Sequence, residues 1–166
     1  MEMKNIKFLP ILIGIFIGIF FKLFVIDIVI VSGDSMEPTL SNGDTLFINK
    51  LAYGIKNPIK PSLLLQWATP HKNDIIIYMH KNKQVVKRCC GVSSEQLTYS
   101  SDSNFNLYVS GEAYPLTEQQ FQRIKYNQIV PKNTVLALGD NSAVSVDSRD
   151  YGFIPVQTIF GKVLCK

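Results

Sequence analysis

Residues 28–40 read Ile-Val-Ile-Val-Ser-Gly-Asp-Ser-Met-Glu-Pro-Thr-Leu. The run of β-branched residues predicts a short strand. In the turn that follows, Gly33 permits backbone conformations that other residues resist, and Pro38 fixes the bend. Such a tight bend can expose the hydroxyl of Ser35 and aim neighbouring N–H groups at one point. Turns rich in Ser, Gly, Asp and Pro are also common without catalytic roles, so this motif needs partners elsewhere in the chain.

Short apolar runs separated by turn residues continue beyond this stretch and predict a mainly β fold, a sandwich or distorted barrel. Ser41–Asp44 is typical of a tight turn, and Thr117–Ile124 indicates a short helix. Asn57–Pro70 contains three prolines and predicts a surface loop. The strands are expected at residues 28–31, 45–48, 74–79, 84–88, 105–109, 135–138 and 162–165.

The composition excludes several classes of protein. With 166 residues, 46% hydrophobic and 18% charged, the chain suffices for one catalytic domain and is not disordered. The net charge of +4 is modest, and no basic cluster interleaved with aromatics indicates nucleic-acid binding. The three cysteines form no Cys-x-x-Cys pair, and His71 and His80 stand alone in polar stretches, so neither a metal nor another cofactor is expected.

Much of the apolar content lies near the N-terminus. Phe8–Ile26 is apolar except for Lys22, whose side chain can extend to a lipid headgroup, and it meets the roughly 20 residues that span a bilayer. Lys4 and Lys7 precede it and favour a cytoplasmic N-terminus. We therefore expect a membrane anchor over residues 1–27 and an exported catalytic domain over 28–166, with a short accessory segment at about 92–134.

Three other interpretations of the apolar segment are open. A cleaved signal peptide would need a shorter apolar core and a small-residue cleavage site, and the segment after Phe21 contains no Ala-x-Ala. A buried core helix is possible, although few core helices are so poor in polar residues. Gly14 and Gly18 match a helix-dimer motif, which is weak evidence when it occurs once.

A serine nucleophile needs a base, and neither histidine has a companion motif for a Ser-His-Asp triad. A lysine can serve if burial lowers its pKa from about 10.4 toward neutrality. Lys87 lies in a predicted strand between Val85-Val86 and Cys89-Cys90, an apolar setting for an ammonium group. The alternative is an edge-strand lysine that faces water.

Residues 139–152, Gly-Asp-Asn-Ser-Ala-Val-Ser-Val-Asp-Ser-Arg-Asp-Tyr-Gly, follow a predicted strand and are dense in hydrogen-bonding groups. Asp147 and Arg149 can form a charge-assisted pair that holds this loop rigid. Ser145 can orient a lysine amine. A solvated turn is the alternative.

Together these stretches resemble the conserved boxes of the bacterial type I signal peptidases, which are Ser/Lys-dyad serine proteases, and they occur in the family's order. Residues 32–40 resemble the nucleophile box, and Gly43-Asp44 through Lys50–Lys56 look like the second box. Lys87-Arg88 with Gly91 resembles the general-base box, and Gly139-Asp140-Asn141, Ser145, Asp147-Ser148-Arg149, Gly152 and Pro155 resemble the last box.

The resemblance implies that Ser35 attacks the scissile carbonyl while Lys87 takes and then returns the proton, and that an acyl-enzyme forms. It also implies that Ser145 positions the Lys87 amine, that Asp147 and Arg149 brace the site, and that Gly33 contributes to the oxyanion hole through its backbone. The positions implied to shape pockets for small residues before the cut are Val29, Val31, Met36, Leu40 and Val86, with Met36 at their mouth.

The expected function is removal of signal peptides from exported preproteins at the bacterial plasma membrane. The expected partners are preproteins and the lipid bilayer, with no nucleic acid and no cofactor.

The chain departs from the family at Ser93-Ser94-Glu95, which replaces Pro-Gly-Asp, and at Cys89-Cys90, which replaces an apolar pair. Three alternatives are a pilin-maturing peptidase of conjugative systems, a self-cleaving repressor and an inactive membrane-tethered binding protein. The apolar N-terminal segment disfavours the repressor, and the joint presence of Ser35, Lys87 and Ser145 disfavours the inactive protein.

Overall fold

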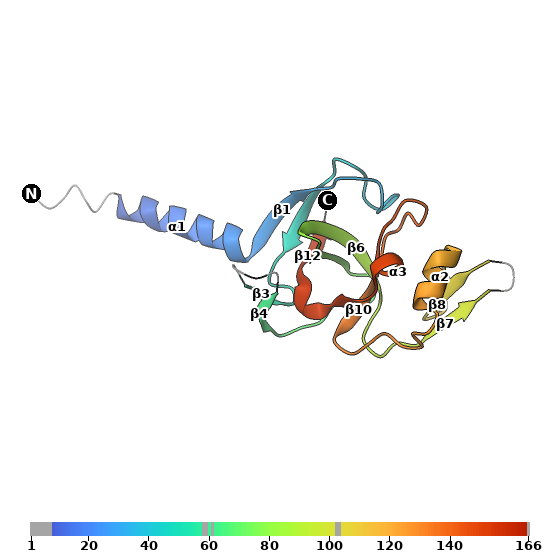
Figure 1. The fold of residues 1–166 in the computed structure, drawn as a ribbon. Helices are drawn as coiled ribbons and strands as arrows, with labels where there is room; N and C mark the ends of the chain where they lie inside the picture. Colours follow the sequence, from blue (N-terminus) through green and yellow to red (C-terminus); the bar gives the residue numbers. More distant parts are fainter. Residues whose placement is uncertain (1–7, 58–59, 61, 102–103, 166) are drawn as a thin grey trace, which may run out of the picture.

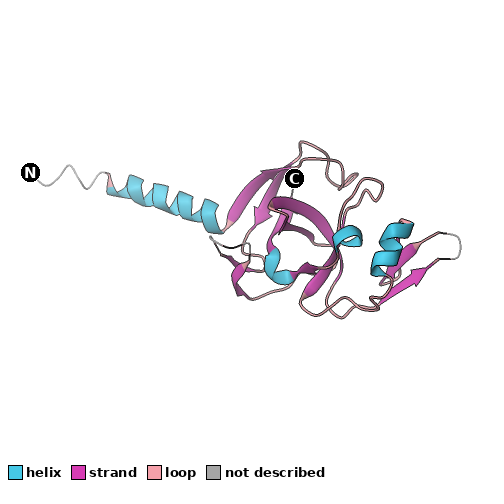
Figure 2. Cartoon of the chain, viewed as in Figure 1, coloured by secondary structure: helices cyan, strands magenta, loops and turns pink. Residues whose placement is uncertain are grey.

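The computed structural model describes residues 8–57, 60, 62–101 and 104–165. One helix, α1 (Leu9–Phe24), projects from a β-rich body at the N-terminal end (Figure 1). The remaining helices of the described chain are short and lie around the strands (Figure 2). The expectation of a mainly β fold is confirmed.

A seven-stranded sheet forms the centre of the body, and all its neighbouring strands pair antiparallel. Every expected strand is present within a few residues of its predicted bounds, six of them in this sheet. In spatial order the strands are β1 (Ile26–Ile30), β2 (Thr45–Asn49), β12 (Ile159–Cys165), β5 (Ile75–His80), β6 (Lys83–Gly91), β10 (Thr134–Leu138) and β11 (Ile154–Pro155).

Two smaller sheets were only partly anticipated. The expected loop over Asn57–Pro70 is wrong in part, because it contains β4 (Leu63–Gln66), which pairs with β3 (Gly54–Lys56). The prolines of that stretch obscured a strand whose leucines are mostly exposed. The middle of the chain forms a three-stranded sheet of β7 (Leu97–Ser100), β8 (Asn106–Val109) and β9 (Glu112–Pro115).

The predicted helix at Thr117–Ile124 is confirmed as α2 (Glu118–Ile124). Thr117 caps it, since its hydroxyl accepts a hydrogen bond from the N–H of Gln120 and the Gln120 side chain bonds back to the N–H of Thr117. Two shorter elements were not predicted, α3 (Ser148–Tyr151) and a 3₁₀ turn, η1 (Val156–Thr158). In α3 the cap is Asp147, whose carboxylate accepts a hydrogen bond from the N–H of Arg149.

The apolar N-terminal segment is shorter as a helix than its sequence suggested. The 16 residues of α1 end at Phe24, and Ile26 already belongs to β1. At about 1.5 Å per residue the helix is about 24 Å long. Within the described residues, no helix has the length and apolar character needed to cross a membrane. All the described side chains of α1 are exposed.

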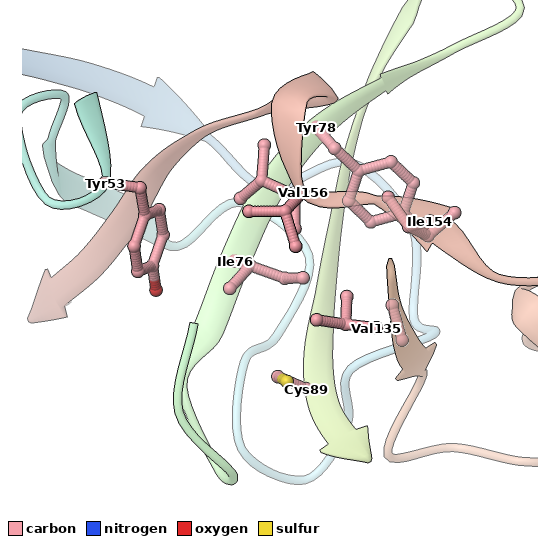
Figure 3. Close-up of a cluster of buried hydrophobic side chains, with 9 residues drawn as sticks. Tyr53, Ile76, Tyr78, Cys89, Val135, Ile154 and Val156 are labelled. Atoms are coloured by element: carbon pink, nitrogen blue, oxygen red, sulfur yellow. The ribbon is translucent and has the colours of Figure 1, made fainter. Parts of the chain in front are cut away.

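Apolar side chains fill both faces of the central sheet because neighbouring residues of a strand point to opposite sides. One cluster gathers Ile76, Tyr78, Cys89 and Val135 with residues from the segments around β3 and β11 (Figure 3). A second cluster, on the other side of β6 and β10, includes Cys90 and joins the sheet to β7, β8 and α2. The middle segment is thereby packed onto the central sheet.

Candidate active site

The loop between β1 and β2 carries Ser35 and closes on itself at its base. The N–H of Val31 donates to the carbonyl oxygen of Asp44 at 2.8 Å, and the N–H of Gly43 donates to the carbonyl oxygen of Val31 at 3.0 Å. Gly33 and Gly43 have φ values of 94° and 91°, in the region that favours glycine. The expected turn at residues 41–44 thus anchors the loop, and Ser35 is held half-buried on it.

Lys87 lies on β6 with only 4% of its surface exposed. Its Nζ donates to Ser35 Oγ at 2.5 Å. Burial lowers the pKa of the Lys87 amine; the nearby carboxylates of Asp147 and Asp140 raise it, and Arg149 lowers it further, leaving a net decrease. A lysine of lowered pKa is more readily neutral, which is the form that accepts a proton from a serine.

The loop after β10 supplies a buried carboxylate with a full set of donors. Asp147 accepts hydrogen bonds from Ser145 Oγ at 2.6 Å, from the N–H of Gly139 at 2.9 Å, and from Nε and Nη2 of Arg149 at 2.9 and 2.7 Å. Asp147 and Arg149 are 0% and 1% exposed. Burial acts to raise the pKa of Asp147, but the hydrogen bonds and charge of Arg149 lower it, so the group stays ionised.

Ser145 was expected to orient the Lys87 amine. Its hydroxyl donates to Asp147, which leaves the oxygen lone pairs as acceptors for an ammonium or a water. The role of Ser145 toward Lys87 therefore stays a prediction.

Gly33 was expected to supply an oxyanion donor from its backbone. Instead its N–H donates to Asn42 Oδ1 at 3.2 Å. A role for this N–H in catalysis would require that bond to open.

Three further residues of the site, Arg88, Asp140 and Gly139, lie in stretches that resembled the family's boxes but were given no role of their own. Arg88 forms a two-point ion pair with Asp140, at 2.8 and 2.6 Å, and donates to Thr39 Oγ1 at 3.1 Å. Arg88 thereby connects β6 to the loop that carries Ser35 and to the loop after β10. The signal that could have identified Arg88 from the sequence is its place directly after Lys87.

Gly139 is the third of these residues. A Cβ at this position would collide with Ser145 Oγ and lie 2.5 Å from the carbonyl oxygen of Ser35. Only glycine lets the two loops approach this closely. The N–H of Asn141 also donates to that Ser35 carbonyl at 3.1 Å.

A cleft of about 490 Å³ opens beside the Ser35–Lys87 pair. It is lined by Val29, Val31, Met36 and Val86, four of the positions expected to shape the substrate pockets. Met36 is only 1% exposed, so it forms part of the floor rather than the mouth. Leu40 is not among the lining residues; it lies in a buried cluster with Val31 and Met36 and supports the floor from beneath.

Comparison with known proteins agrees with this geometry. Residues 3–166 match the family described as "Signal peptidase, peptidase S26". The chain belongs to the peptidase S26 signal peptidase family.

Several relatives of the family cover most of the chain. A signal peptidase I of Bacillus caldolyticus is 33% identical over 160 residues, which cover 86% of this chain and 79% of that protein. A signal peptidase IB of Staphylococcus aureus is 30% identical, with 80% and 73% covered. A crystal structure of a signal peptidase I from Enterococcus faecalis matches 59% of this chain and 98% of that one, with 26% identity and a TM-score of 0.42.

Proposed function

We propose that this protein is a serine endopeptidase that removes signal peptides from exported preproteins, with Ser35 as nucleophile and Lys87 as general base. The observation that carries the proposal is the 2.5 Å contact between Lys87 Nζ and Ser35 Oγ, formed by a buried amine of lowered pKa. Membership of the peptidase S26 family agrees with it. An inactive binding protein would have no need to keep a lysine amine buried at the cost of its hydration.

In the proposed reaction the neutral Lys87 amine accepts the hydroxyl proton as Ser35 Oγ attacks the scissile carbonyl carbon. The C–N bond then breaks, Lys87 returns the proton to the leaving amine, and an ester remains on Ser35. Lys87 next removes a proton from water, whose oxygen attacks the ester carbonyl, and Lys87 returns that proton to Ser35 Oγ as the ester bond breaks. We expect the N–H of Ser35 to stabilise the negative carbonyl oxygen, while Asp147 and Arg149 keep the loop after β10 in position.

The cleft suits an extended peptide. β1 is an edge strand of the central sheet. Residues 83–87 of β6 pair with β5 on one side, whereas β10 pairs with β6 on the other side only from Arg88 onward in the described pairings. Backbone N–H and C=O groups on both sides of the cleft are therefore available to a strand of substrate. The apolar, medium-sized floor residues favour small side chains near the cut and exclude charged ones by their desolvation cost.

We also infer that α1 anchors the protein in the bacterial plasma membrane, with a cytoplasmic N-terminus and the catalytic domain outside. Most of the exposed side chains of α1 are aliphatic or aromatic, and the helix projects away from the body (Figure 1). Such a surface is unfavourable in water and favourable in lipid. A signal peptide also leaves its cut site at the membrane surface, beside this domain.

The direct test uses the full chain in detergent with several preproteins and one pilin precursor. Product termini are identified by mass spectrometry, with Ser35→Ala as the control. We expect cleavage after small residues in the preproteins and none by the variant. Cleavage of the pilin precursor alone would restrict the proposal to a dedicated peptidase, and cleavage of no substrate would overturn it.

A further inference from the structure

Three aliphatic side chains at the rim of the catalytic cleft are exposed, although each lines it. Ile30 is 67% exposed, Val144 57% and Val146 65%. We refer to these three residues as the collar. Exposed β-branched side chains around a cleft are surface that an apolar group can cover.

The collar side chains are exposed beside buried or half-buried neighbours in their own elements. In β1 the exposed Ile30 stands between the less exposed Val29 and the buried Val31, both floor residues. In the loop after β10, Ser145 is 6% exposed and turns toward Asp147, while Val144 and Val146 on either side of it are exposed. The collar is therefore supplied by two of the elements that line the cleft, β1 and the loop after β10.

An extended substrate has the same alternation. If the residue before the cut and the residue two places earlier rest on the floor, the residue between them points away from it. Its side chain then leaves the floor toward the rim, where the collar supplies aliphatic surface from both sides and has no charge of its own.

We propose that the collar is a subsite for an apolar side chain at the second residue before the cut, so that the recognised sequence is small–apolar–small. This inference rests on the proposed peptidase function. A medium-sized aliphatic residue such as Leu or Val buries collar surface, whereas Asp or Lys loses hydration beside three uncharged side chains. Discrimination between such side chains in an apolar subsite corresponds to a roughly tenfold difference in kcat/KM.

The test is a competition between preproteins that share Ala at both floor positions and carry Leu, Ser, Asp or Lys between them. Each preparation is given two substrates at once, and the ratio of products gives the ratio of kcat/KM. This ratio does not depend on how much of the preparation is folded. The native protein should prefer Leu to Asp by roughly tenfold, with Ser between them.

The variants Val144→Ser, Val146→Ser and Ile30→Thr should each reduce the Leu preference, and the triple variant should nearly abolish it. Ile28→Thr is the matched control, because Ile28 lies on the same exposed face of β1 at 59% exposure and does not line this cleft. It should keep the native ratio.

Equal cleavage of all four substrates by the native protein would overturn the subsite and leave the peptidase standing, whereas cleavage of none would refute the peptidase itself. Binding to vesicles of anionic and neutral lipid is measured in parallel. If the collar variants lose vesicle binding and cleave every substrate equally less, the collar is a membrane contact and the subsite is wrong.

Discussion

Lys87 Nζ and Ser35 Oγ lie 2.5 Å apart although the two residues are 52 positions apart in the chain. The pair brings a loop that follows β1 against the middle of β6. The amine enters this contact with 4% of Lys87 exposed, so that water does little to stabilise its charge. The local geometry therefore carries both halves of the proposed chemistry, the nucleophile and a base that can be neutral.

The first prediction concerns the pH dependence of cleavage. Because the active form is the neutral amine and burial lowers its pKa, kcat/KM should rise with pH and level off below the ordinary lysine value of 10.5. Asp140→Asn removes a carboxylate that raises the Lys87 pKa, so the rising limb should move to lower pH. A rate that is independent of pH would contradict a lysine base, and a rate that rises only near 10.5 would contradict the lowered pKa of Lys87.

The second prediction concerns stability. In the folded chain Lys87 binds its proton less tightly than in the unfolded chain, so burial of the charged amine destabilises the protein below the lowered pKa. Lys87→Met should therefore raise Tm at neutral pH by a few degrees, which for a chain of this size corresponds to about 1 kcal/mol. As pH rises from the lowered pKa toward 10.5, the buried amine loses its proton, so the difference in Tm between the native protein and Lys87→Met should shrink. Thermal unfolding from neutral to alkaline pH measures it, and a difference that grows with pH would refute this reading.

The third prediction concerns the close approach of two loops at Gly139. Gly139→Ala should lower kcat/KM about a hundredfold, because the added Cβ displaces Ser145 or the backbone of Ser35. Gly18→Ala is the control, since a Cβ there meets nothing within 4 Å. Steady-state kinetics and circular dichroism separate misplacement from unfolding. A folded Gly139→Ala protein with native activity would contradict the close approach of the loop after β10 to the Ser35 loop.

The fourth prediction concerns the cysteines, all of which are free thiols. Burial raises the pKa of Cys89 to about 12 and that of Cys90 to about 11, so neither is a thiolate near neutrality. Cys165 is exposed on the last strand. Replacing all three with Ala or Val should preserve cleavage and remove any response to thiol reagents. Complete loss in a folded variant would indicate a thiol mechanism.

The sequence was sufficient to predict the positions of most strands and to identify Ser35 and Lys87, which the structure brings into contact, as a candidate pair. β-branched runs between turn residues mark strands wherever those residues are buried, as in β5 and β10. The dyad was predicted because a serine turn and an apolar lysine strand occur with a third polar loop in a recognisable order. None of the three stretches was decisive alone.

Other features depend on contacts that no local pattern encodes. β4 escaped prediction because two of its leucines, Leu64 and Leu65, are exposed and its identity comes from pairing with β3. The Arg88–Asp140 ion pair joins residues 52 apart, and the need for glycine at 139 arises only when the Ser35 loop is packed against it. The end of α1 at Phe24 likewise follows from the pairing of Ile26 with Asn49, not from a change in hydrophobicity.

The most direct test of the account is single-turnover cleavage of one preprotein by the native protein and by Ser35→Ala, Lys87→Ala and the double variant. Since the serine is inactive without its base, we predict that each single variant loses essentially all cleavage and that the double variant is no worse. Lys87→Arg should also fail, because arginine stays protonated. Substantial cleavage by folded Lys87→Ala, or losses that add in the double variant, would show that Ser35 and Lys87 do not act as one unit.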